Sequence, residues 1–329
     1  MKPITVGQIG IGHNHGKRKM ETVRRHPELF EVIGYAESDP KWLEERGSLP
    51  QYEGLPRLSE EELLEKCEAI LVECDVWNLT ATAQRCINAG KHIHLDKPAS
   101  GTLAEYRRLL DSAKAKNLVV QLGYMYRYNP AIRWCMDAVR DGRLGTVTSI
   151  NAEMSTFHKP EYRRWLQNFD GGIQYILGSH LVDLIVGILG EPDRVTSFLK
   201  HTGTDGVDAS DNNLSVLEYG STLARVFVSS VEVNGWGRRQ FVVCGTKGTV
   251  HIEPIENTTK LIYSDLDIAV KSYEDLSVEI PVEDVPKELR YEAMMKDFYA
   301  FVREGKKNPW DYDYEYTVQK VLYDMIGRK

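Results

Sequence analysis

The chain contains 329 residues, which is enough for two domains with separate hydrophobic cores. Its formal net charge of -7 and its pI near 5.8 lack the positive excess that nucleic acids and anionic membranes attract, so we expect a small-molecule partner. The five cysteines are scattered without the paired spacing of a disulfide framework or a zinc site, and we expect them to be reduced.

The N-terminal residues carry the pattern of a dinucleotide-binding turn. An apolar run from Ile4 to Ile9 leads directly into Gly10-Ile11-Gly12-His13-Asn14-His15-Gly16, and a helix-compatible stretch follows. Gly10 permits a tight turn, Gly12 lets a pyrophosphate approach, and the helix presents unpaired N–H groups to that anion. The usual third glycine is replaced by His15. Because the first strand begins at Ile4, no room is left for a signal peptide, and no run suits a bilayer span, so we expect a cytoplasmic protein.

An acidic residue ends the second apolar run. Phe30 to Ala36 is followed by Glu37, at the distance from the turn where dinucleotide-binding folds place a carboxylate. A carboxylate there accepts hydrogen bonds from the adenosine ribose and repels a 2'-phosphate, which favours NAD over NADP. The alternative is that Glu37 merely ends a strand. Asp39 is interpreted as the N-cap of the helix near Trp42.

The remaining N-terminal elements alternate between strand and helix. Capping boxes at Ser59–Glu62 and Thr102–Glu105 predict helices, and a third helix is predicted from Thr80 to Ala89. The alternation predicts a doubly wound parallel sheet over residues 1–123, with its ligand crevice at the carboxyl ends of the strands. The strands predicted here after the first two are Ala69 to Cys74, His92 to Leu95, and Leu118 to Gly123.

Residues 124–329 predict a second domain of the α+β class. Asn129-Pro130 caps a helix, and the alternating segments that follow predict a large open sheet that is mainly antiparallel. Helices are predicted over Glu288 to Arg303 and Tyr314 to Ile326. The predicted strands are Thr146 to Ser155, Asn213 to Tyr219, Ala224 to Val233, and Gln240 to Cys244.

Two segments at strand ends carry candidate chemistry. Lys97 follows a buried strand and Asp96, so its ammonium is expected to point into the crevice, where it could polarise a substrate oxygen. The alternative is a surface lysine paired with Asp96. Further along, Gly123 to Pro130 joins Tyr126 and Arg127 in an aromatic cluster that suits a polyhydroxylated or carboxylated ligand, although packing at the domain junction explains it equally well.

A third segment joins paired glycines to a histidine. Gly171-Gly172 precedes an apolar helix predicted from Ile173 to Leu189, which carries His180 and Asp183. The glycines predict the close approach of backbone or ligand. By itself His180 fits a buried core residue as well as a base. We predict no metal site, since the contexts of the four N-terminal histidines suit packing and phosphate approach equally well: His13, His15, His92 and His94.

The order of these segments resembles the family of glucose-fructose oxidoreductase, inositol dehydrogenase and MocA. The resemblance covers nearly the whole chain and adds the "GRLG" turn at Gly142, the "GTKGTV" turn from Gly245 and the "NPWD" segment from Asn308. It implies a Rossmann domain followed by a sheet that binds substrate and joins subunits into a homodimer or homotetramer. It also implies hydride transfer between nicotinamide and a sugar or polyol carbon.

The resemblance implies roles for particular residues. Lys97 would contact the reacting oxygen, and His180 would take the hydroxyl proton, for which its ordinary pKa is suited. The implied or inferred catalytic residues are Lys97, His180 and Asp183. The cofactor-binding residues are Gly10, Gly12, His13, Asn14, His15, Glu37, Cys74, Asp75, Asp96 and Lys97. The substrate-binding residues are Lys97, Tyr126, Arg127, Arg163, Trp165 and His180.

Two departures from the family pattern leave the reaction open. Ile176 stands where the family commonly has an aspartate one helical turn before the histidine, so Asp183 is the remaining candidate to support His180. Glu73-Cys74-Asp75-Val76 replaces the usual Ala-Thr-Pro-Asn. We therefore expect an NAD-dependent oxidoreductase, and keep as alternatives a redox-neutral glycoside cleavage or isomerisation with tightly bound NAD, and a non-catalytic NAD-dependent sensor.

Overall fold

The computed structural model describes residues 2–267 and 277–328. The chain forms two compact units, the first made of Met1–Met125 and Glu288–Tyr316, the second of Tyr126–Lys287 and Thr317–Lys329. The first break lies close to the predicted boundary at residue 123. Residues 288–316 belong to the first unit, although their helix was assigned to the second domain from the sequence.

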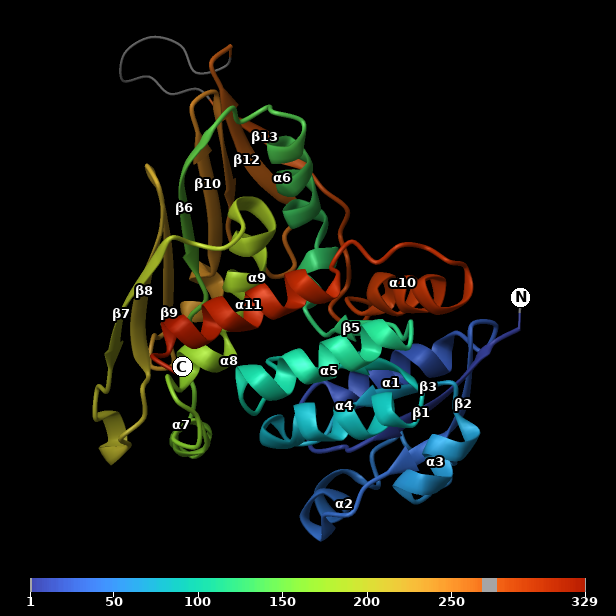
Figure 1. The fold of residues 1–329 in the computed structure, drawn as a ribbon. Helices are drawn as coiled ribbons and strands as arrows, with labels where there is room; N and C mark the ends of the chain where they lie inside the picture. The colour runs from blue at the N-terminus through green and yellow to red at the C-terminus, as the bar shows by residue number, and fades with distance from the viewer. Residues whose placement is uncertain (1, 268–276, 329) are drawn as a thin grey trace. The chain divides into compact units, whose positions relative to one another are not determined.

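The first unit contains a five-stranded sheet in the order β2-β1-β3-β4-β5, in which all neighbouring strands are parallel (Figure 1). Strand β3 is a continuous apolar run, as expected where helices cover a parallel sheet on both faces, whereas β1 contains Gln8 and β4 contains His92 and His94. The expected doubly wound architecture is thus confirmed. The strands are β1 (Ile4–Ile9), β2 (Phe30–Ala36), β3 (Ala69–Val72), β4 (His92–Leu95) and β5 (Val120–Leu122).

Local capping determines several helix starts in this unit. The side chains of Ser59 and Thr102 accept hydrogen bonds from the N–H groups of Glu62 and Glu105, completing both predicted capping boxes. Asp39 caps its helix as predicted, through a 2.9 Å hydrogen bond from the N–H of Lys41. The helices between the strands are α1 (Gly16–Arg25), α2 (Pro40–Arg46), α3 (Glu60–Lys66), the short η1 (Val76–Asn78), α4 (Leu79–Asn88) and α5 (Leu103–Ala115).

The late helix α10 (Glu292–Arg303) packs in the first unit through its apolar face. Phe298 meets His94 of β4 edge to face, and Gln121 of β5 donates a 3.0 Å hydrogen bond to the carbonyl of Met294. The burial of this face explains the assignment of residues 288–316 to the first unit. The last helix, α11 (Tyr312–Met325), continues into the second unit.

The second unit contains an eight-stranded sheet in the order β13-β12-β11-β10-β6-β9-β8-β7. Strands β6 and β9 are parallel and the other neighbours are antiparallel, so the predicted mainly antiparallel sheet is confirmed. Strands β7, β12 and β13 were not predicted from the sequence, whereas β11 follows the predicted turn from Gly245 to Gly248. The strands are β6 (Val147–Glu153), β7 (Arg194–Lys200), β8 (Asn212–Tyr219), β9 (Thr222–Ser229), β10 (Gln240–Gly245), β11 (Gly248–Ile252), β12 (Lys260–Asp265) and β13 (Val278–Pro281).

Helices cover one face of this sheet. Figure 1 shows α8 (Ile173–Ile176) and α9 (Gly178–Leu189) against β6, β8 and β9. The predicted helix from Ile173 to Leu189 is interrupted at Leu177, which keeps helical backbone angles (φ -94°, ψ -37°) between α8 and α9. A Cβ on Gly172 would lie 2.3 Å from the carbonyl oxygen of Ser210, so the close approach predicted at the paired glycines is made by backbone. The other helices are the short η2 (Met125–Tyr128), η3 (Thr204–Gly206) and η4 (Gly235–Arg238), and α6 (Pro130–Arg140) and α7 (Pro160–Leu166).

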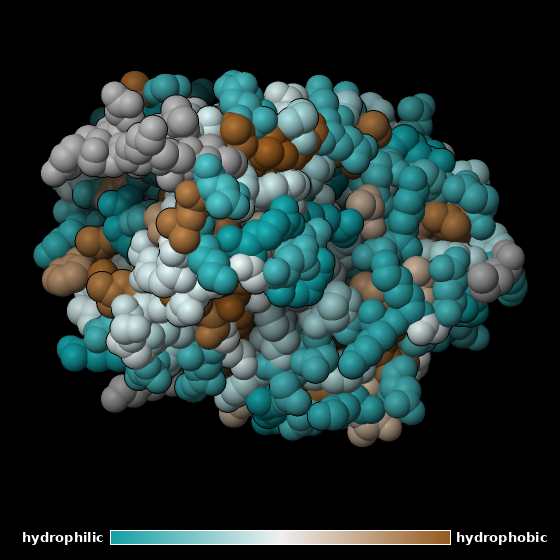
Figure 2. Space-filling view, turned by 90° about the horizontal axis from the view of Figure 1, so that it is seen from above, coloured by the Kyte–Doolittle hydropathy of each residue, from teal (hydrophilic) through white to brown (hydrophobic). Residues whose placement is uncertain are grey.

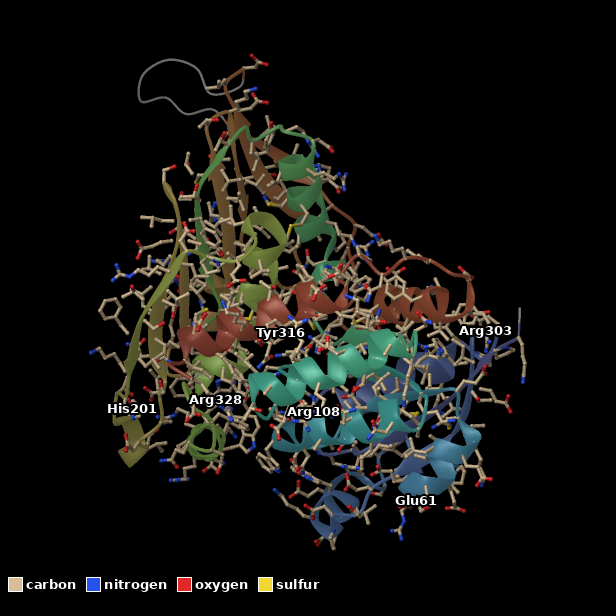
Figure 3. All side chains as sticks on the ribbon, viewed as in Figure 1. Glu61, Arg108, His201, Arg303, Tyr316 and Arg328 are labelled. Atoms are coloured by element: carbon tan, nitrogen blue, oxygen red, sulfur yellow. The ribbon has the colours of Figure 1, made fainter. Side chains whose placement is uncertain are left out.

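The surface is polar with separate apolar patches. Figure 2 shows hydrophilic residues over most of the face seen from above, interrupted by hydrophobic ones. Exposed charged side chains such as Glu61 of α3 and Arg108 of α5 lie on the outer sides of their helices (Figure 3). None of the described helices combines the length and apolar composition needed to cross a bilayer.

Candidate functional site

The glycine turn joins β1 to α1 and lies against the end of β3. Gly10 has a φ of +85°, and a Cβ there would lie 2.3 Å from Cα of Cys74, so no other residue fits without moving the backbone. At Gly12, a Cβ would lie 2.6 Å from Nε1 of Trp42. Both glycines therefore allow close approach, and at Gly12 the approaching group in this structure is an indole.

A cavity of about 680 Å³ opens beside the turn in the first unit. Glu37 lines it, and its carboxylate accepts hydrogen bonds from the N–H groups of Ile11 (2.8 Å) and Asp39 (2.9 Å). Each oxygen keeps a further lone pair for a ligand hydroxyl. The predicted cofactor residues that share this cavity are Gly10, Glu37, Cys74 and Asp75.

Helix α2 holds the outside of the turn through two side chains that sequence reasoning missed. Nη1 of Arg46 lies 2.8 to 3.0 Å from the carbonyl oxygens of three successive turn residues, and Nη2 donates to Oδ1 of Asn14 at 2.9 Å. Trp42 donates from Nε1 to Oδ2 of Asp75 at 2.8 Å. Arg46 also lies 4.5 Å from the Trp42 ring. These contacts place a positive charge beside the glycine turn.

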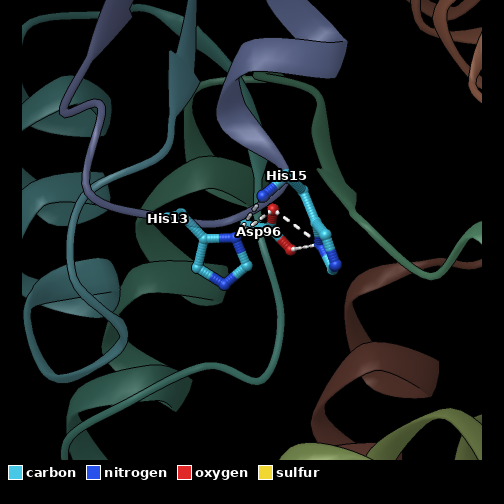
Figure 4. Close-up of side chains that lie close together, drawn as sticks. All are labelled: His13, His15 and Asp96. Atoms are coloured by element: carbon cyan, nitrogen blue, oxygen red, sulfur yellow. Dashed lines mark hydrogen bonds and ion pairs between the residues drawn. The ribbon is translucent and has the colours of Figure 1, made fainter. Parts of the chain in front are cut away.

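Asp96, the residue directly after β4, contacts the glycine turn through two histidines (Figure 4). Its Oδ2 lies 2.8 Å from Nδ1 of His13 and 3.2 Å from Nδ1 of His15. Its Oδ1 accepts a 2.7 Å hydrogen bond from the backbone N–H of Lys97. The structure thus brings together four residues that the sequence assigned to the cofactor site.

Lys19 completes the cluster from the buried face of α1. Its Nζ lies 2.7 Å from Oδ2 of Asp96 and 2.8 Å from Oε1 of Glu73, and all three side chains are 0% exposed. Burial alone raises the pKa of Asp96, but His13 and Lys19 outweigh it and hold that pKa well below its usual range. Burial and the repulsion of Asp96 raise the pKa of Glu73 well above its usual range. Asp96 is thus the ionised carboxylate of the cluster, and Glu73 retains its proton to higher pH.

The same cluster has the spacing of a metal site but not its charge. Ligand atoms of His13, His15 and Asp96 all lie within 4.8 Å of one another. A divalent cation there would sit beside the Lys19 ammonium, which is bonded to the same carboxylate. Among the described residues, this arrangement fits an internal ion network better than a metal centre.

Buried histidines make stability depend on pH. Burial, against the attraction of Asp96, lowers the pKa of His15 to about 3, and burial lowers that of His94 well below its usual range. The unfolded chain therefore binds protons that the native state excludes as pH falls below about 6.5. Stability conferred by the neutral histidines is present above that pH. We expect it to fall on acidification, by up to about 1.4 kcal/mol per pH unit for each histidine.

Urea denaturation between about pH 7 and pH 5 measures this effect. His15→Asn should flatten the dependence, whereas His201→Asn, at an exposed histidine paired with Asp208, should leave it unchanged. Equal slopes for the wild type and His15→Asn would contradict the assignment.

Lys97 is 3% exposed and follows β4 at the carboxyl edge of the sheet. It is therefore not a surface lysine, which was the alternative drawn from the sequence. The backbone bond to Asp96 holds its main chain to the ion cluster.

The candidate residues of the second unit separate into three groups. Tyr126 and His180 meet edge to face, with ring centroids 4.9 Å apart, and His180 is 5% exposed. Arg127 forms a two-pronged ion pair with Asp183, with N–O distances of 2.6 to 3.0 Å. The fork of donors that was expected to meet a ligand thus meets Asp183. Asp183 lies on the same helix as His180, and Arg127 holds it in place.

The third group lies on α7. Arg163 is fully buried, donates to the carbonyl of Thr204 at 2.8 Å and pairs with Asp205. Trp165 is half-buried between the rings of Tyr162 and Phe169. Both candidate residues therefore have structural contacts within the second unit.

Sequence signals existed for only some of the missed residues. Lys19 shares the i, i+3, i+4, i+7 spacing of the buried face of α1 with Gly16, Met20 and Val23, so its burial was readable as a pattern. Nothing local marks Arg46, because its partners are backbone carbonyls distant in sequence.

A parallel sheet with this glycine turn and a cavity lined by Glu37 has the features of a dinucleotide-binding Rossmann domain, and a large mixed sheet forms the second unit. Residues 4–124 match the "Oxidoreductase family, NAD-binding Rossmann fold" and residues 132–251 match the "GFO/IDH/MocA C-terminal domain". The chain belongs to the GFO/IDH/MocA family of oxidoreductases, as its motifs predicted.

Known proteins similar to this chain include sugar oxidoreductases. An uncharacterised oxidoreductase of Schizosaccharomyces pombe is 25% identical over 76% of this chain and 70% of its own length. The dTDP-3,4-didehydro-2,6-dideoxy-alpha-D-glucose 3-reductase of Actinomadura kijaniata is 23% identical over 93% of this chain and 96% of its own. A levoglucosan dehydrogenase, solved with NADH and levoglucosan, has a TM-score of 0.85 at 18% identity and covers 99% of this chain and 96% of its own.

Proposed function

We propose that this protein is an NAD-dependent oxidoreductase that moves a hydride between nicotinamide and a carbinol carbon of a sugar, polyol or sugar derivative. The observation that carries the proposal is the carboxylate of Glu37, which lines the cavity beside Gly10. The substrates of the similar reductase and of the structurally similar levoglucosan dehydrogenase support a carbohydrate substrate.

The residues of the first unit fit a dinucleotide. Glu37 would accept the ribose hydroxyls, and Gly10 and Gly12 would admit the diphosphate beside the positive charge of Arg46. The indole of Trp42 lies against Gly12 on the side where a Cβ would be, and it is held there by Asp75. When bound, nicotinamide supplies the hydride acceptor.

Lys97 and His180 are proposed to handle the substrate oxygen. The Lys97 ammonium would stabilise negative charge as it develops on that oxygen, and His180 would accept its proton. Arg127 holds Asp183, so we propose that Asp183 positions the helix of His180 rather than exchanging protons. Reduction uses the same groups in reverse.

One experiment tests the function. Purified protein is mixed with NAD and a panel of sugars, polyols and glycosides, and both NADH absorbance and products are recorded. A gain in NADH with a keto product supports the proposal. Sugar release without a net gain in NADH, or binding without turnover, would contradict it and support the redox-neutral reaction or the sensor.

Glu37 should determine the choice of cofactor. Glu37→Ala removes the acceptor of the ribose hydroxyls, so we expect about a tenfold loss in affinity for NADH. The preference for NADH over NADPH should also become smaller. Fluorescence titration with both nucleotides measures this. Glu31→Ala, at an exposed glutamate of the same strand, serves as control. An unchanged NADH affinity in Glu37→Ala would contradict the assignment.

We propose that subunits associate through the uncovered face of the eight-stranded sheet. Phe198 and Leu223 are 51% and 52% exposed, and Phe198 pairs with Leu214, which pairs with Phe227. This apolar row lies opposite the face that the helices cover and suits a second copy of the same surface. Light scattering should give the mass of a dimer or tetramer, and a monomer would contradict the proposal.

A further inference from the structure

A buried polar cluster adjoins His180 within the second unit. The hydroxyl of Tyr126 and Nη1 of Arg239 both donate to Oε1 of Glu256. Nε of Arg239 donates to the carbonyl of Ser155 at 3.0 Å. Since the Tyr126 ring meets the His180 ring, Glu256 is linked to the proposed base through a single tyrosine.

The other oxygen of Glu256 lacks a donor. Glu256 is 6% exposed, and its Oε2 is buried with no hydrogen-bond partner in the part of the chain that the structure describes. Burying a carboxylate oxygen without a donor is unfavourable. A ligand hydroxyl beside Oε2 would supply the missing hydrogen bond.

An exposed indole lies next to this carboxylate. Trp236, in η4, is 41% exposed, and its ring centre lies 4.1 Å from the guanidinium carbon of Arg239. The buried guanidinium fixes one side of the ring, because Arg239 is held by Glu256 and backbone. A fixed aromatic surface beside a hydrogen-bond acceptor suits the C–H face and hydroxyls of a sugar ring.

A second unpartnered atom belongs to the same neighbourhood. Nδ1 of His158 is buried without a hydrogen-bond partner among the described residues, and its ring stacks on Tyr162 at 4.1 Å. Burial, followed by repulsion from Arg239 and Arg163, lowers the pKa of His158 to about 4. His158 is therefore neutral at physiological pH and offers hydrogen bonding without charge.

The guanidinium groups of the cluster face carboxylates, and the exposed ammonium of Lys287 lies 5.5 Å from the centre of the Trp236 ring. Arg239 faces Glu256, Arg238 faces Glu232, and Arg225 lies 3.2 Å from Glu153. Arg239 balances the carboxylate charge of Glu256, which both oxygens share, so what Oε2 lacks is a hydrogen-bond donor. A ligand hydroxyl can donate to Oε2, whereas a diphosphate oxygen can only accept, so Oε2 suits a hydroxyl and not a diphosphate.

We propose that Glu256 and Trp236 form a substrate-binding subsite for an uncharged sugar or polyol, with Oε2 of Glu256 accepting a substrate hydroxyl and the indole contacting its C–H face. The proposal rests on the proposed oxidoreductase function and narrows its substrate class to free, rather than nucleotide-linked, carbohydrates.

Calorimetric titration of the full chain in the presence of NADH tests the subsite. The neutral probes are D-glucose, myo-inositol and levoglucosan, and the charged probes are UDP-glucose and dTDP-glucose. We expect a neutral probe to bind and the charged probes not to bind. Glu256→Gln and Trp236→Ala should each weaken the neutral probe by about tenfold, as expected for the loss of one hydrogen bond or aromatic contact. The affinity for NADH should stay unchanged.

Glu253→Gln is the matched control, because Glu253 lies in the same connection but pairs with the exposed side chain of His251. Trp236→Ala keeps the test valid if Glu256→Gln unfolds, since Trp236 is 41% exposed whereas Glu256 is 6% exposed. Wild-type affinity in both variants, or binding of the charged probes alone, would overturn the subsite. If the wild type fails to bind NADH, the proposed function is contradicted. If it binds NADH but none of the neutral probes, only the subsite is contradicted.

Discussion

Replacing Lys97 with methionine is expected to lower kcat by about 10²- to 10⁴-fold, the range for loss of one group that handles charge or protons in a transition state. Methionine keeps most of the buried volume of this 3% exposed side chain and removes its ammonium. The carboxylate of Glu37 and the glycine turn are untouched, so any loss of NADH affinity measures the cofactor contact that was also expected of Lys97. The loss in kcat at saturating NADH measures the effect of Lys97 on the reaction.

Steady-state turnover of a substrate found by the panel, together with NADH titration, separates these quantities. Lys91→Met is the matched control, since Lys91 precedes the same strand at its opposite end and is only half-buried. We expect that variant to turn over at the wild-type rate. Full activity in Lys97→Met would remove Lys97 from the proposed mechanism.

Replacing Lys19 with methionine is expected to destabilise the protein by about 3 to 5 kcal/mol, the cost of leaving one member of a buried ion pair without its partner. Asp96 would keep a negative charge at 0% exposure after losing the ammonium 2.7 Å away. The free energy of unfolding from urea denaturation measures this loss.

Two further variants locate the cause of that instability. Lys19→Met combined with Asp96→Asn removes both charges, so part of the lost stability should return. Arg18→Met removes a partly exposed partner of Glu21 on the same helix and should cost less than about 1 kcal/mol. If the urea midpoint of Lys19→Met equals that of the wild type, the ion pair of Lys19 with Asp96 does not stabilise the glycine turn.

Features governed by neighbouring residues were predictable. The alternation of strand and helix patterns identified a parallel sheet, and the side chains of Asp39, Ser59 and Thr102 marked helix starts. The conformation of Gly10 followed from its place in the turn. Each of these features depends on residues that are close in the sequence, so the local sequence pattern is enough to predict it.

Features made by distant residues were not predictable in this way. The interruption at Leu177 is followed directly by Gly178 and Ser179, a pair that can kink a helix, but the sequence does not fix which residue leaves the hydrogen-bond pattern. Strand β7 has no clear alternation of buried and exposed residues, so a search for residues that alternate with period two does not find it. Helix α10 was recognised as a helix, but only its buried contacts show that it packs in the first unit.

The sequence by itself determined the family, the parallel sheet, the glycine turn and the acidic residue at its edge, because ordered motifs and local periodicity encode them. Only the tertiary structure decided what those residues touch. Lys19 meets Glu73 and Asp96 across separations of 54 and 77 residues, and Tyr126 meets Glu256 across 130. Folding buries these charged and polar groups, and a buried charge is stable only beside a partner. The partner can come from any part of the chain, so local sequence does not reveal it.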